Sequence, residues 1–352
     1  MLVSLLLGVA ESSCPCKDSK LCDPLQTPAR SELFVFGGSG YELYNWTNIT
    51  TLVWWDGPWD PNVICYAHAR GVRVVLATGS IHTPELHDPQ RIDNYIQQIL
   101  ATVQSQYMDG VNIDFEDRID EEDHISRDLF TLFVKKLSTA IYSNIPGSQV
   151  TIDVGWAPNK DVRFYDYYTL STLVDFFFVM AYDEQSQIFG ICKAGPTSDF
   201  RNLDIGISMF VAEGIPVDKL VLGLPWYGHS FSCVNQVNDT VCPIPLFPWR
   251  GVICSDLYAT EYAYQDIISQ YLPISSTGIR WDEDSKSVWL NYVDINGYPR
   301  QLWFDNATSL SMKVEWAKFA KMRGVGMYTA DFVDYTKQQY LDFWVAFNNF
   351  FD

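Results

Sequence analysis

The chain has 352 residues, of which 47% are hydrophobic and 15% aromatic, and its formal net charge at pH 7 is −19. This length fits one large α/β barrel or two average domains, and the apolar content excludes an intrinsically disordered chain. The negative charge argues against binding to nucleic acid or to anionic membrane surfaces, because their phosphates would repel the protein.

The first segment, residues 1–10, is an apolar run of signal-peptide length. Gly8 and Ala10 are small residues that suit cleavage after Ala10. No Lys or Arg precedes the run, so we expect a signal peptide that is incomplete at its start. A membrane anchor is disfavoured because the run is much shorter than the roughly 20 residues needed to span a bilayer. We therefore expect residues 11–352 to form a single catalytic domain in the secretory pathway.

The sequons and the cysteines also indicate passage through the secretory pathway. Glycosylation sequons begin at Asn45, Asn48, Asn238 and Asn306. The eight cysteines, an even number, predict disulfide bonds, although their pairing cannot be read from the sequence. Zinc is disfavoured because the cysteines lack paired C-x-x-C spacing and partnered histidines. We expect no metal at the histidines either, because their spacing does not suit metal ligands. They are assigned to the surface or the core: His68, His82, His87, His124 and His229.

Short apolar runs recur along the chain with helix-length connections between most of them, which predicts a parallel (β/α)8 barrel, the TIM barrel. The candidate strands are Leu33–Phe36, Thr51–Trp55, Val72–Thr78, Gly110–Glu116, Val150–Trp156, Phe176–Tyr182, Leu220–Pro225 and Gly326–Thr329. One helix is marked by an apolar repeat, namely Ile125, Leu129, Phe133, Leu137 and Ile141.

A later helix contains Ala317 and Ala320 and is expected to close at Gly324, just before the last strand. The long gap between the last two strands predicts a small β-rich insertion at about residues 229–305. Within it, Arg280–Phe304 alternates apolar and polar residues around the turn signal Asn296-Gly297.

The most informative segment is Asp109-Gly110-Val111-Asn112-Ile113-Asp114-Phe115-Glu116. Side chains alternate across a strand, so Asn112, Asp114 and Glu116 share one face, with neighbours roughly 7 Å apart. Inward-facing carboxylates are costly to bury unless a site uses them. A single acid would be better explained by a solvated strand end. Three polar groups in register favour a catalytic site.

This octapeptide closely resembles the Asp-x-x-Asp-x-Asp-x-Glu signature of family 18 glycoside hydrolases, the chitinases and their relatives. Asp109, Asp114 and Glu116 match, whereas Asn112 stands where most chitinases have Asp. One branch, which cleaves the di-N-acetylchitobiose core of asparagine-linked glycans, has this Asn. The resemblance to that branch extends along most of the chain, at Tyr107–Gly110, Met180–Gln187, Pro225–Gly228 and Cys14-Pro15-Cys16.

The resemblance implies a site at the carboxyl ends of the strands and substrate-assisted hydrolysis with retention, in which the N-acetyl oxygen of the sugar is the nucleophile. It makes Glu116 the general acid, kept protonated by anionic Asp114, which orients the acetamido N–H. Tyr182 is expected to align the acetamido oxygen. The expected sugar-binding residues are Asp183, Tyr227, Trp226, Trp156, Tyr328 and Asn112. No cofactor is implied.

Several of these residues have a plain structural alternative. Trp156, Trp226 and Tyr328 are as easily explained by barrel packing, and Tyr328 stands where many family members have a Trp under the sugar. Asn112 can hydrogen-bond to Asp114 but cannot hold a shared proton, which puts a relay through three acids in doubt. Asp109 points away from Asp114 and is expected to serve the strand itself.

The leading interpretation is a monomeric lysosomal glycosidase that cleaves the GlcNAc-β(1→4)-GlcNAc core from the reducing end during oligosaccharide breakdown. An acidic chain is compatible with an acidic compartment. One alternative is a secreted endo-chitinase, which needs a long open groove. The other is a catalytically inactive chitin-binding lectin on the same fold. The presence of both Asp114 and Glu116 argues against the lectin.

Overall fold

The structure, a computed structural model, describes residues 13–352 apart from residues 29, 56, 80, 185–190 and 235–238. The expected signal peptide at residues 1–10 and the sequon asparagine at position 238 lie outside the described residues. No helix in the described part combines the length and the apolar character needed to cross a bilayer.

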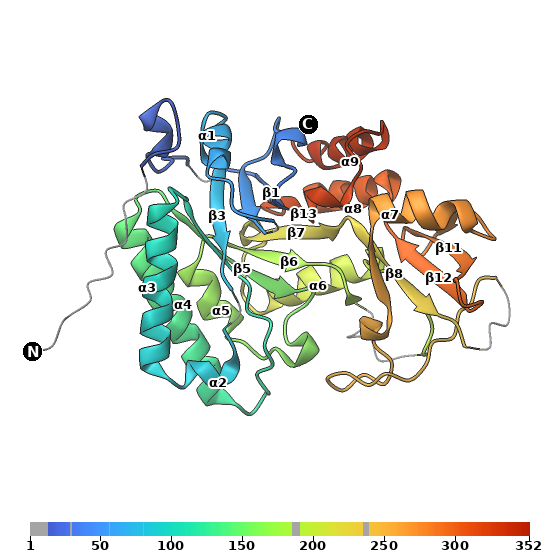
Figure 1. The fold of residues 1–352 in the computed structure, drawn as a ribbon. Coiled ribbons are helices and arrows are strands. Elements are labelled where there is room, and N and C mark those ends of the chain that lie inside the picture. Colours follow the sequence, from blue (N-terminus) through green and yellow to red (C-terminus); the bar gives the residue numbers. More distant parts are fainter. Residues whose placement is uncertain (1–12, 29, 56, 80, 185–190, 235–238) are drawn as a thin grey trace, which may run out of the picture.

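Eight parallel strands close into a barrel in the order β1-β13-β7-β6-β5-β4-β3-β2 (Figure 1). They are β1 (Glu32–Gly37), β2 (Thr51–Trp54), β3 (Arg73–Ala77), β4 (Gly110–Ile113), β5 (Gln149–Gly155), β6 (Phe176–Met180), β7 (Leu220–Pro225) and β13 (Gly324–Tyr328). The predicted (β/α)8 barrel is confirmed, and each predicted run overlaps one strand. β4 and β6 end earlier than expected, so Asp114, Glu116 and Tyr182 lie just beyond their strands.

The helices pack around the outside of the barrel, with α3 and α4 side by side along one flank (Figure 1). They are α1 (Asn62–His68), α2 (Thr83–Leu86), α3 (Pro89–Ser105), α4 (His124–Asn144), α5 (Tyr167–Leu173), α6 (Phe200–Ala212), α8 (Ala307–Phe319) and α9 (Gln339–Asn348), whereas the short α7 (Tyr264–Asp266) follows β9 (Thr260–Ala263) in the second sheet described below. The main hydrophobic core fills the layer between these helices and the strands.

The predicted helices form, with small differences at their ends. In α4, Phe133, Leu137 and Ile141 of the apolar repeat are buried, whereas Ile125 is 67% exposed. Ile125 is exposed because it lies in the first turn, one residue after the start of the helix. The later helix ends at Phe319, and Gly324 is the first residue of β13 rather than the helix terminator.

Phenylalanine rings fill the inside of the barrel. Phe34, Phe36, Phe176 and Phe178 belong to one buried cluster in which each ring contacts another at 5.0–5.6 Å between centroids. Gly223 makes room for them, because a Cβ at that position would lie 2.3 Å from the Phe178 ring. The interior is therefore a packed core, as expected for a barrel of this size.

The predicted insertion between the last two barrel strands is confirmed as a second, antiparallel sheet, ordered β10-β11-β12-β8-β9. Its strands are β8 (Tyr227–Ser232), β9 (Thr260–Ala263), β10 (Arg280–Asp282), β11 (Ser287–Val293) and β12 (Pro299–Phe304). β8 follows β7 after a single residue, Trp226, so the sheet begins directly at the carboxyl end of the barrel.

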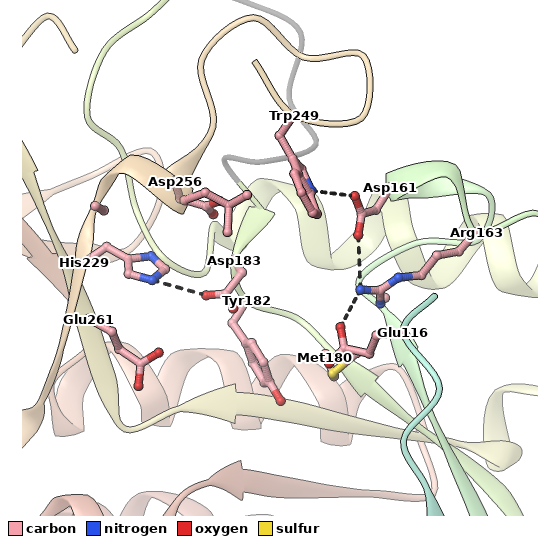
Figure 2. Close-up of a pocket in the computed structure, with 13 residues that line it drawn as sticks. Glu116, Asp161, Arg163, Met180, Tyr182, Asp183, His229, Trp249, Asp256 and Glu261 are labelled. Atoms are coloured by element: carbon pink, nitrogen blue, oxygen red, sulfur yellow. Dashed lines mark hydrogen bonds and ion pairs between the residues drawn. The ribbon is translucent and has the colours of Figure 1, made fainter. Parts of the chain in front are cut away.

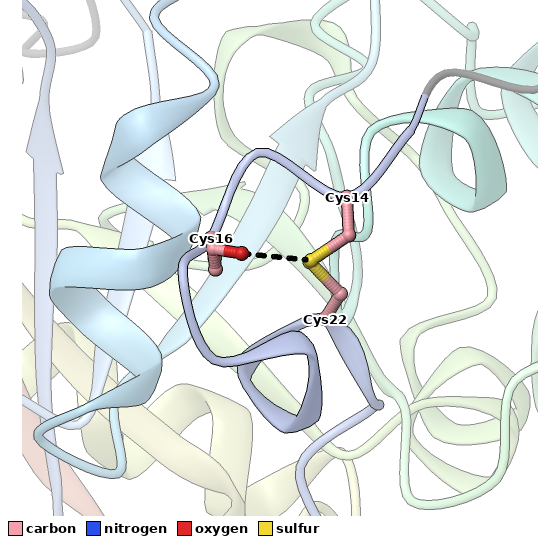
Figure 3. A group of neighbouring side chains, drawn as sticks. All are labelled: Cys14, Cys16 and Cys22. Carbon is pink, nitrogen blue, oxygen red and sulfur yellow. Dashed lines mark hydrogen bonds between the residues drawn. A yellow bond between two sulfur atoms is a disulfide. The ribbon is translucent and has the colours of Figure 1, made fainter.

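All eight cysteines are paired, as Cys14–Cys22, Cys16–Cys65, Cys192–Cys254 and Cys233–Cys242. Cys14, Cys16 and Cys22 lie close together, with Cys14 bonded to Cys22 (Figure 3). The Cys16–Cys65 bridge ties the amino-terminal segment to α1. These three sulfurs are bonded in disulfides, so their proximity offers no thiolate to a metal. The other two bridges fasten the loop between β8 and β9, which lies next to the site described below.

Candidate active site

Asp114 and Glu116 follow directly after β4, and the residue between them fixes their direction. The Phe115 ring stacks on Phe130 of α4 with centroids 4.2 Å apart, so it points away from the barrel axis. The Tyr165 hydroxyl donates to the carbonyl oxygens of Phe115 at 3.2 Å and Asp117 at 2.6 Å, which holds this backbone. Asp114 and Glu116 consequently both face the mouth of the barrel, as the alternation predicted.

The two acids have different surroundings. Asp114 is largely buried, and burial together with the neighbouring Glu116 carboxyl raises its pKa to about 7. The Glu116 side chain is 48% exposed and forms an ion pair with Arg163, whose own side chain is 8% exposed. We expected anionic Asp114 to keep Glu116 protonated. In the structure it is the pKa of Asp114 that burial and the neighbouring Glu116 carboxyl raise, and Glu116 is the acid that contacts Arg163.

We expect Asn112 to hydrogen-bond to Asp114, but its side-chain hydrogen bonds go to other residues. Its Nδ2 donates to Asp153 Oδ2 at 2.6 Å, and its Oδ1 accepts from the Thr151 hydroxyl at 2.6 Å. The side chain is fully buried and is absent from the lining of both cavities described below. Its expected role in sugar binding is therefore not supported by its position. Asn112 orients Asp153, a buried acid on β5 that the sequence analysis missed.

A small cavity of about 140 Å³, the inner cavity, lies at the carboxyl ends of the barrel strands. Its lining combines three carboxyl groups near β4 and β5 with aromatic rings and two further acids. The residues are Phe36, Trp55, Asp114, Glu116, Asp153, Met180, Tyr182, Asp183, Tyr227, Glu261 and Tyr328. Of the expected site residues, Asp114, Glu116, Tyr182, Asp183, Tyr227 and Tyr328 meet here.

The rings of the inner cavity support one another. Tyr182, Tyr227 and Tyr328 form a triangle with centroids 5.9–6.1 Å apart, and Trp55 packs edge-on against Tyr328 at 5.5 Å. The Tyr227 hydroxyl donates to Asp183 Oδ1 at 2.6 Å. These contacts provide an apolar floor with hydroxyl and carboxyl groups at its edge, the combination that sugar rings require.

The outer cavity, of about 370 Å³, adjoins the inner one at Glu116, Met180, Tyr182, Asp183 and Glu261 (Figure 2). One side consists of Asp161, Arg163 and Trp249, close to Glu116 in the figure. The other side comes from the second sheet and the loop before β9, with His229, Asp256, Leu257, Ala259 and Glu261. The insertion therefore supplies a large part of this cavity.

An ionic chain braces the Asp161 side of the outer cavity. Asp161 Oδ2 lies 3.1 Å from Arg163 Nη2 and 2.8 Å from Arg250 Nη1, and Asp161 Oδ1 accepts from Trp249 Nε1 at 3.1 Å. Arg250 also donates to the carbonyl oxygen of Glu116 at 3.3 Å. The loop between β8 and β9 is thus tied to the segments after β4 and β5. We call Asp161, Arg163, Trp249 and Arg250 the wall.

His229 and the acids around it form the opposite side. His229 Nε2 lies 3.7 Å from Asp183 Oδ1, and burial lowers the pKa of His229 although Asp183 opposes this. Burial raises the pKa of Asp183, and burial together with Asp183 raises that of Glu261 to about 7. Asp183, His229 and Asp256 each bring a ligand-type atom within 4.8 Å of the others. Chemically, this side offers hydrogen-bond donors and acceptors to hydroxyl groups.

Two expected binding residues lie in the core instead. Trp226 is 1% exposed and packs against Phe343, Trp344 and Phe347 of α9 at 5.2–5.8 Å between centroids. Trp156 is buried, with its ring next to Gly206 of α6. Neither lines the inner or the outer cavity. Each is next in sequence to a residue that does, Tyr227 or Gly155, and side chains alternate along a strand. For both, the observed burial fits the packing alternative.

Asp109 serves the fold, as predicted. Its carboxylate accepts from the backbone N–H of Leu25 at 3.1 Å and Val74 at 2.8 Å, and it lies 2.8 Å from His68 Nε2. His229 was assigned to the surface or the core, and it is a buried residue that also lines the outer cavity. Its sequence position could have indicated this role, because His229 lies two residues after Tyr227 and therefore on the same face of the strand.

The described sequon asparagines are all half-buried but have different partners. Asn45 and Asn48 are half-buried, and Asn48 Nδ2 donates to Asn348 Oδ1 at 3.2 Å. Asn306 is half-buried and caps the amino terminus of α8 through its Oδ1. Glycosylation at these positions stays a prediction.

The chain matches the family model described as "Glycosyl hydrolases family 18" over residues 66–332. It is 36% identical to di-N-acetylchitobiase from Mus musculus, covering 98% of this chain and 96% of that protein. It is 37% identical to the Homo sapiens di-N-acetylchitobiase, covering 95% and 88%. Its fold matches the Ostrinia furnacalis Group IV chitinase with a TM-score of 0.70 and 18% identity, covering 91% and 99%. The chain therefore belongs to family 18 of the glycosyl hydrolases and is a chitin-related glycosidase of the kind that includes the di-N-acetylchitobiases.

Proposed function

We propose that the protein is a monomeric lysosomal hydrolase of the GlcNAc-β(1→4)-GlcNAc bond, which acts at the reducing end of oligosaccharides derived from asparagine-linked glycans. The observation that carries the proposal is the meeting of two cavities at Glu116. One contains Asp114 and Tyr182, and the other is closed on one side by the wall. The curated relatives named di-N-acetylchitobiase support the same substrate class.

The inner cavity would hold the sugar whose bond is cleaved. Its volume is below the roughly 300 Å³ typical of clefts for drug-sized ligands, which suits one pyranose ring. The tyrosine triangle and Trp55 would contact the face of that ring. Tyr182 and Asp114 would hold its acetamido group, Tyr182 at the carbonyl oxygen and Asp114 at the N–H.

Cleavage would use the substrate's own acetamido group as the nucleophile. Its carbonyl oxygen bonds to C1 while the C1–O4 bond breaks, and Glu116 gives a proton to O4 of the leaving sugar. The product is a cyclic oxazolinium ion. Water then attacks C1 as Glu116 accepts the water's proton, the ring opens, and the new hydroxyl at C1 has the β configuration.

The proton for this step can come from Asp114. In acid the Asp114–Glu116 pair holds a proton on Asp114, because burial raises its pKa to about 7, while Glu116 pairs with Arg163. A leaving sugar in the outer cavity brings O4 to Glu116 and competes with Arg163. The proton then passes from Asp114 to Glu116 and onward to O4. The Asp114 carboxylate that remains offsets the positive charge of the oxazolinium ion.

The wall would limit the leaving-group side to a single sugar. Asp161, Arg163 and Trp249 line the outer cavity next to Glu116, and Arg250 ties them to the insertion loop. A reducing-end GlcNAc still joined to asparagine would meet this wall, whereas a free reducing end would fit. The disulfides Cys192–Cys254 and Cys233–Cys242 fasten the loop that presents Trp249 and Arg250.

The proposed lysosomal location rests on the disulfides and on the pH dependence of the Asp114–Glu116 pair. Four disulfides suit a protein of the secretory pathway. The Asp114–Glu116 pair keeps its transferable proton only below the Asp114 pKa of about 7, so an acidic compartment favours the active state.

The mechanism is tested by the configuration of the first-formed product. Early-time NMR of the hydrolysis of a GlcNAc oligosaccharide should show the β anomer, and a thiazoline analogue of the sugar should inhibit competitively. The α anomer as first product would overturn the mechanism. Binding of the oligosaccharide without any turnover by the wild-type protein would favour the lectin instead.

A further inference from the structure

A fully buried acid on β5, Asp153, faces the inner cavity behind Asp114. Its side chain lines this cavity and is 3% exposed. Asp153 Oδ2 accepts the hydrogen bond from Asn112 Nδ2, but Asp153 Oδ1 has no hydrogen-bond partner among the described residues. Asp114 Oδ1 is likewise buried and unpartnered within the described part of the chain. Two orphaned carboxyl oxygens therefore lie in the lining of one small cavity.

The surroundings of Asp153 disfavour a carboxylate there. Burial raises its pKa well above the ordinary value, and the neighbouring acids Asp114 and Glu116 raise it further. From β6, Tyr182 also interacts with Asp153, and it contributes no positive charge. Arg163, after β5, is ion-paired with Glu116 and Asp161. The hydrogen-bond donor of Asp153 is the neutral amide of Asn112.

Asn112 also determines which oxygen of Asp153 is free to carry a proton. The Thr151 hydroxyl donates to Asn112 Oδ1, which leaves Asn112 Nδ2 as the group that points at Asp153 Oδ2. Oδ2 must then be an acceptor, and a proton on Asp153 belongs on Oδ1. A proton on Oδ1 makes Asp153 a hydrogen-bond donor, and the unpartnered Asp114 Oδ1 can accept that hydrogen bond.

We propose that Asp153 is a positioning residue that stays protonated throughout turnover and donates a hydrogen bond from Oδ1–H to Asp114 Oδ1. Its effect on catalysis rests on the proposed function. When Asp114 passes its proton to Glu116, the Asp114 carboxylate would remain in a buried site and needs a donor. Neutral Asp153 supplies it without adding a second negative charge. No proton leaves Asp153, so the overall reaction stays balanced.

The proposal distinguishes two substitutions whose side chains branch at the same carbon as Asp. Asp153→Asn keeps a neutral side chain that can accept from Asn112 and donate to Asp114, and it should retain kcat within about threefold. Asp153→Leu keeps the branched shape, at a larger volume, but removes the donor. It should lower kcat about 10- to 100-fold, the range for losing a hydrogen bond to a charged group, with KM little changed. The alkaline limb of its kcat profile should move to higher pH, because the Asp114 carboxylate is no longer stabilised and Asp114 keeps its proton to higher pH.

A spectroscopic measurement on the free enzyme keeps this test independent of activity and of the substrate assignment. The infrared difference spectrum of wild type minus Asp153→Asn at pH 6 should contain the carbonyl band of a protonated carboxyl group. Absence of that band would overturn the proposal even if the enzyme cleaves its substrate. An Asp153→Asn variant as impaired as Asp153→Leu would also overturn it, as would wild-type kcat and pH profile in Asp153→Leu. If wild type cleaves no GlcNAc oligosaccharide, the proposed function fails while the infrared result still decides the state of Asp153.

Discussion

The side chain of Glu116 forms an ion pair with the buried guanidinium of Arg163, and Arg163 in turn contacts Asp161 in the wall. The proposed acid is therefore linked, through two charged groups, to the structure that bounds the leaving-group side. The ion pair places a positive charge beside the Glu116 carboxyl, which has to accept a proton from water in the second step. In the first step the leaving sugar has to displace this contact.

Glu116→Gln should keep the fold and the binding of sugar but lower kcat by about two orders of magnitude or more, because general-acid assistance is lost. Steady-state kinetics and calorimetric binding of chitobiose measure the two effects separately. Glu121→Gln is the matched control, since Glu121 is an exposed acid a few residues further along the same loop. Near-normal turnover in a folded Glu116→Gln protein would remove Glu116 from the mechanism.

Asp114→Asn should also impair turnover and should change the pH profile. In wild type we expect activity to fall as pH rises through about 7, where Asp114 loses the proton that the pair needs. In the Asn variant the ionisation of residue 114 no longer sets this alkaline limb, so the limb should move to a different pH. Measuring kcat from pH 4 to pH 8 for both proteins tests the coupling; superimposable profiles would contradict it.

Arg250→Ala should loosen the wall without touching the inner cavity, because Arg250 lines neither cavity but holds Asp161 at 2.8 Å. Chitobiose should then appear among the early products from chitin oligomers, and asparagine-linked substrates should be cleaved faster than by wild type. Arg118→Ala is the control, since it removes an exposed Arg–Asp ion pair on the loop that follows Glu116. An unchanged product pattern in Arg250→Ala would mean that the wall does not set specificity.

Stability should depend on the buried Glu184. Burial raises its pKa to about 8 from an ordinary value of 4.5, so the folded state binds the proton more tightly than the unfolded state. The free energy of unfolding should therefore be largest below about pH 4.5 with respect to this group and should fall as pH rises through 8, by up to a few kcal/mol. Glu184→Gln should flatten this dependence.

Chemical denaturation at pH 5 and pH 8 measures the effect, with Asp204→Asn on the exposed face of α6 as control. The Gln side chain can still accept the hydrogen bonds from Asp199 N–H and Asn202 Nδ2. If Glu184→Gln loses as much stability between these pH values as wild type does, another group is responsible.

The barrel was predictable from the recurrence of short apolar runs with helix-length connections, and the acids after β4 from the local alternation of apolar and polar residues. The same rule places Asp153 inward on β5, but a single acid within a long apolar strand was not singled out. Trp226 and Trp156 were misassigned since a one-residue shift turns a side chain from the barrel mouth to the helices. The wall could not be predicted, because Trp249 and Arg250 meet Asp161 across 88 and 89 residues of sequence. No local pattern encodes such a contact.

The most direct test of the account compares a free N-glycan oligosaccharide that ends in GlcNAc-β(1→4)-GlcNAc with the same oligosaccharide still joined to asparagine. The reducing-end sugar carries an isotopic label, and early products are identified by mass spectrometry. We predict that the free oligosaccharide releases a single labelled GlcNAc and that the asparagine-linked one is left intact. Equal cleavage of both, or labelled chitobiose as the main early product from chitin oligomers, would contradict the account and identify an endo-chitinase.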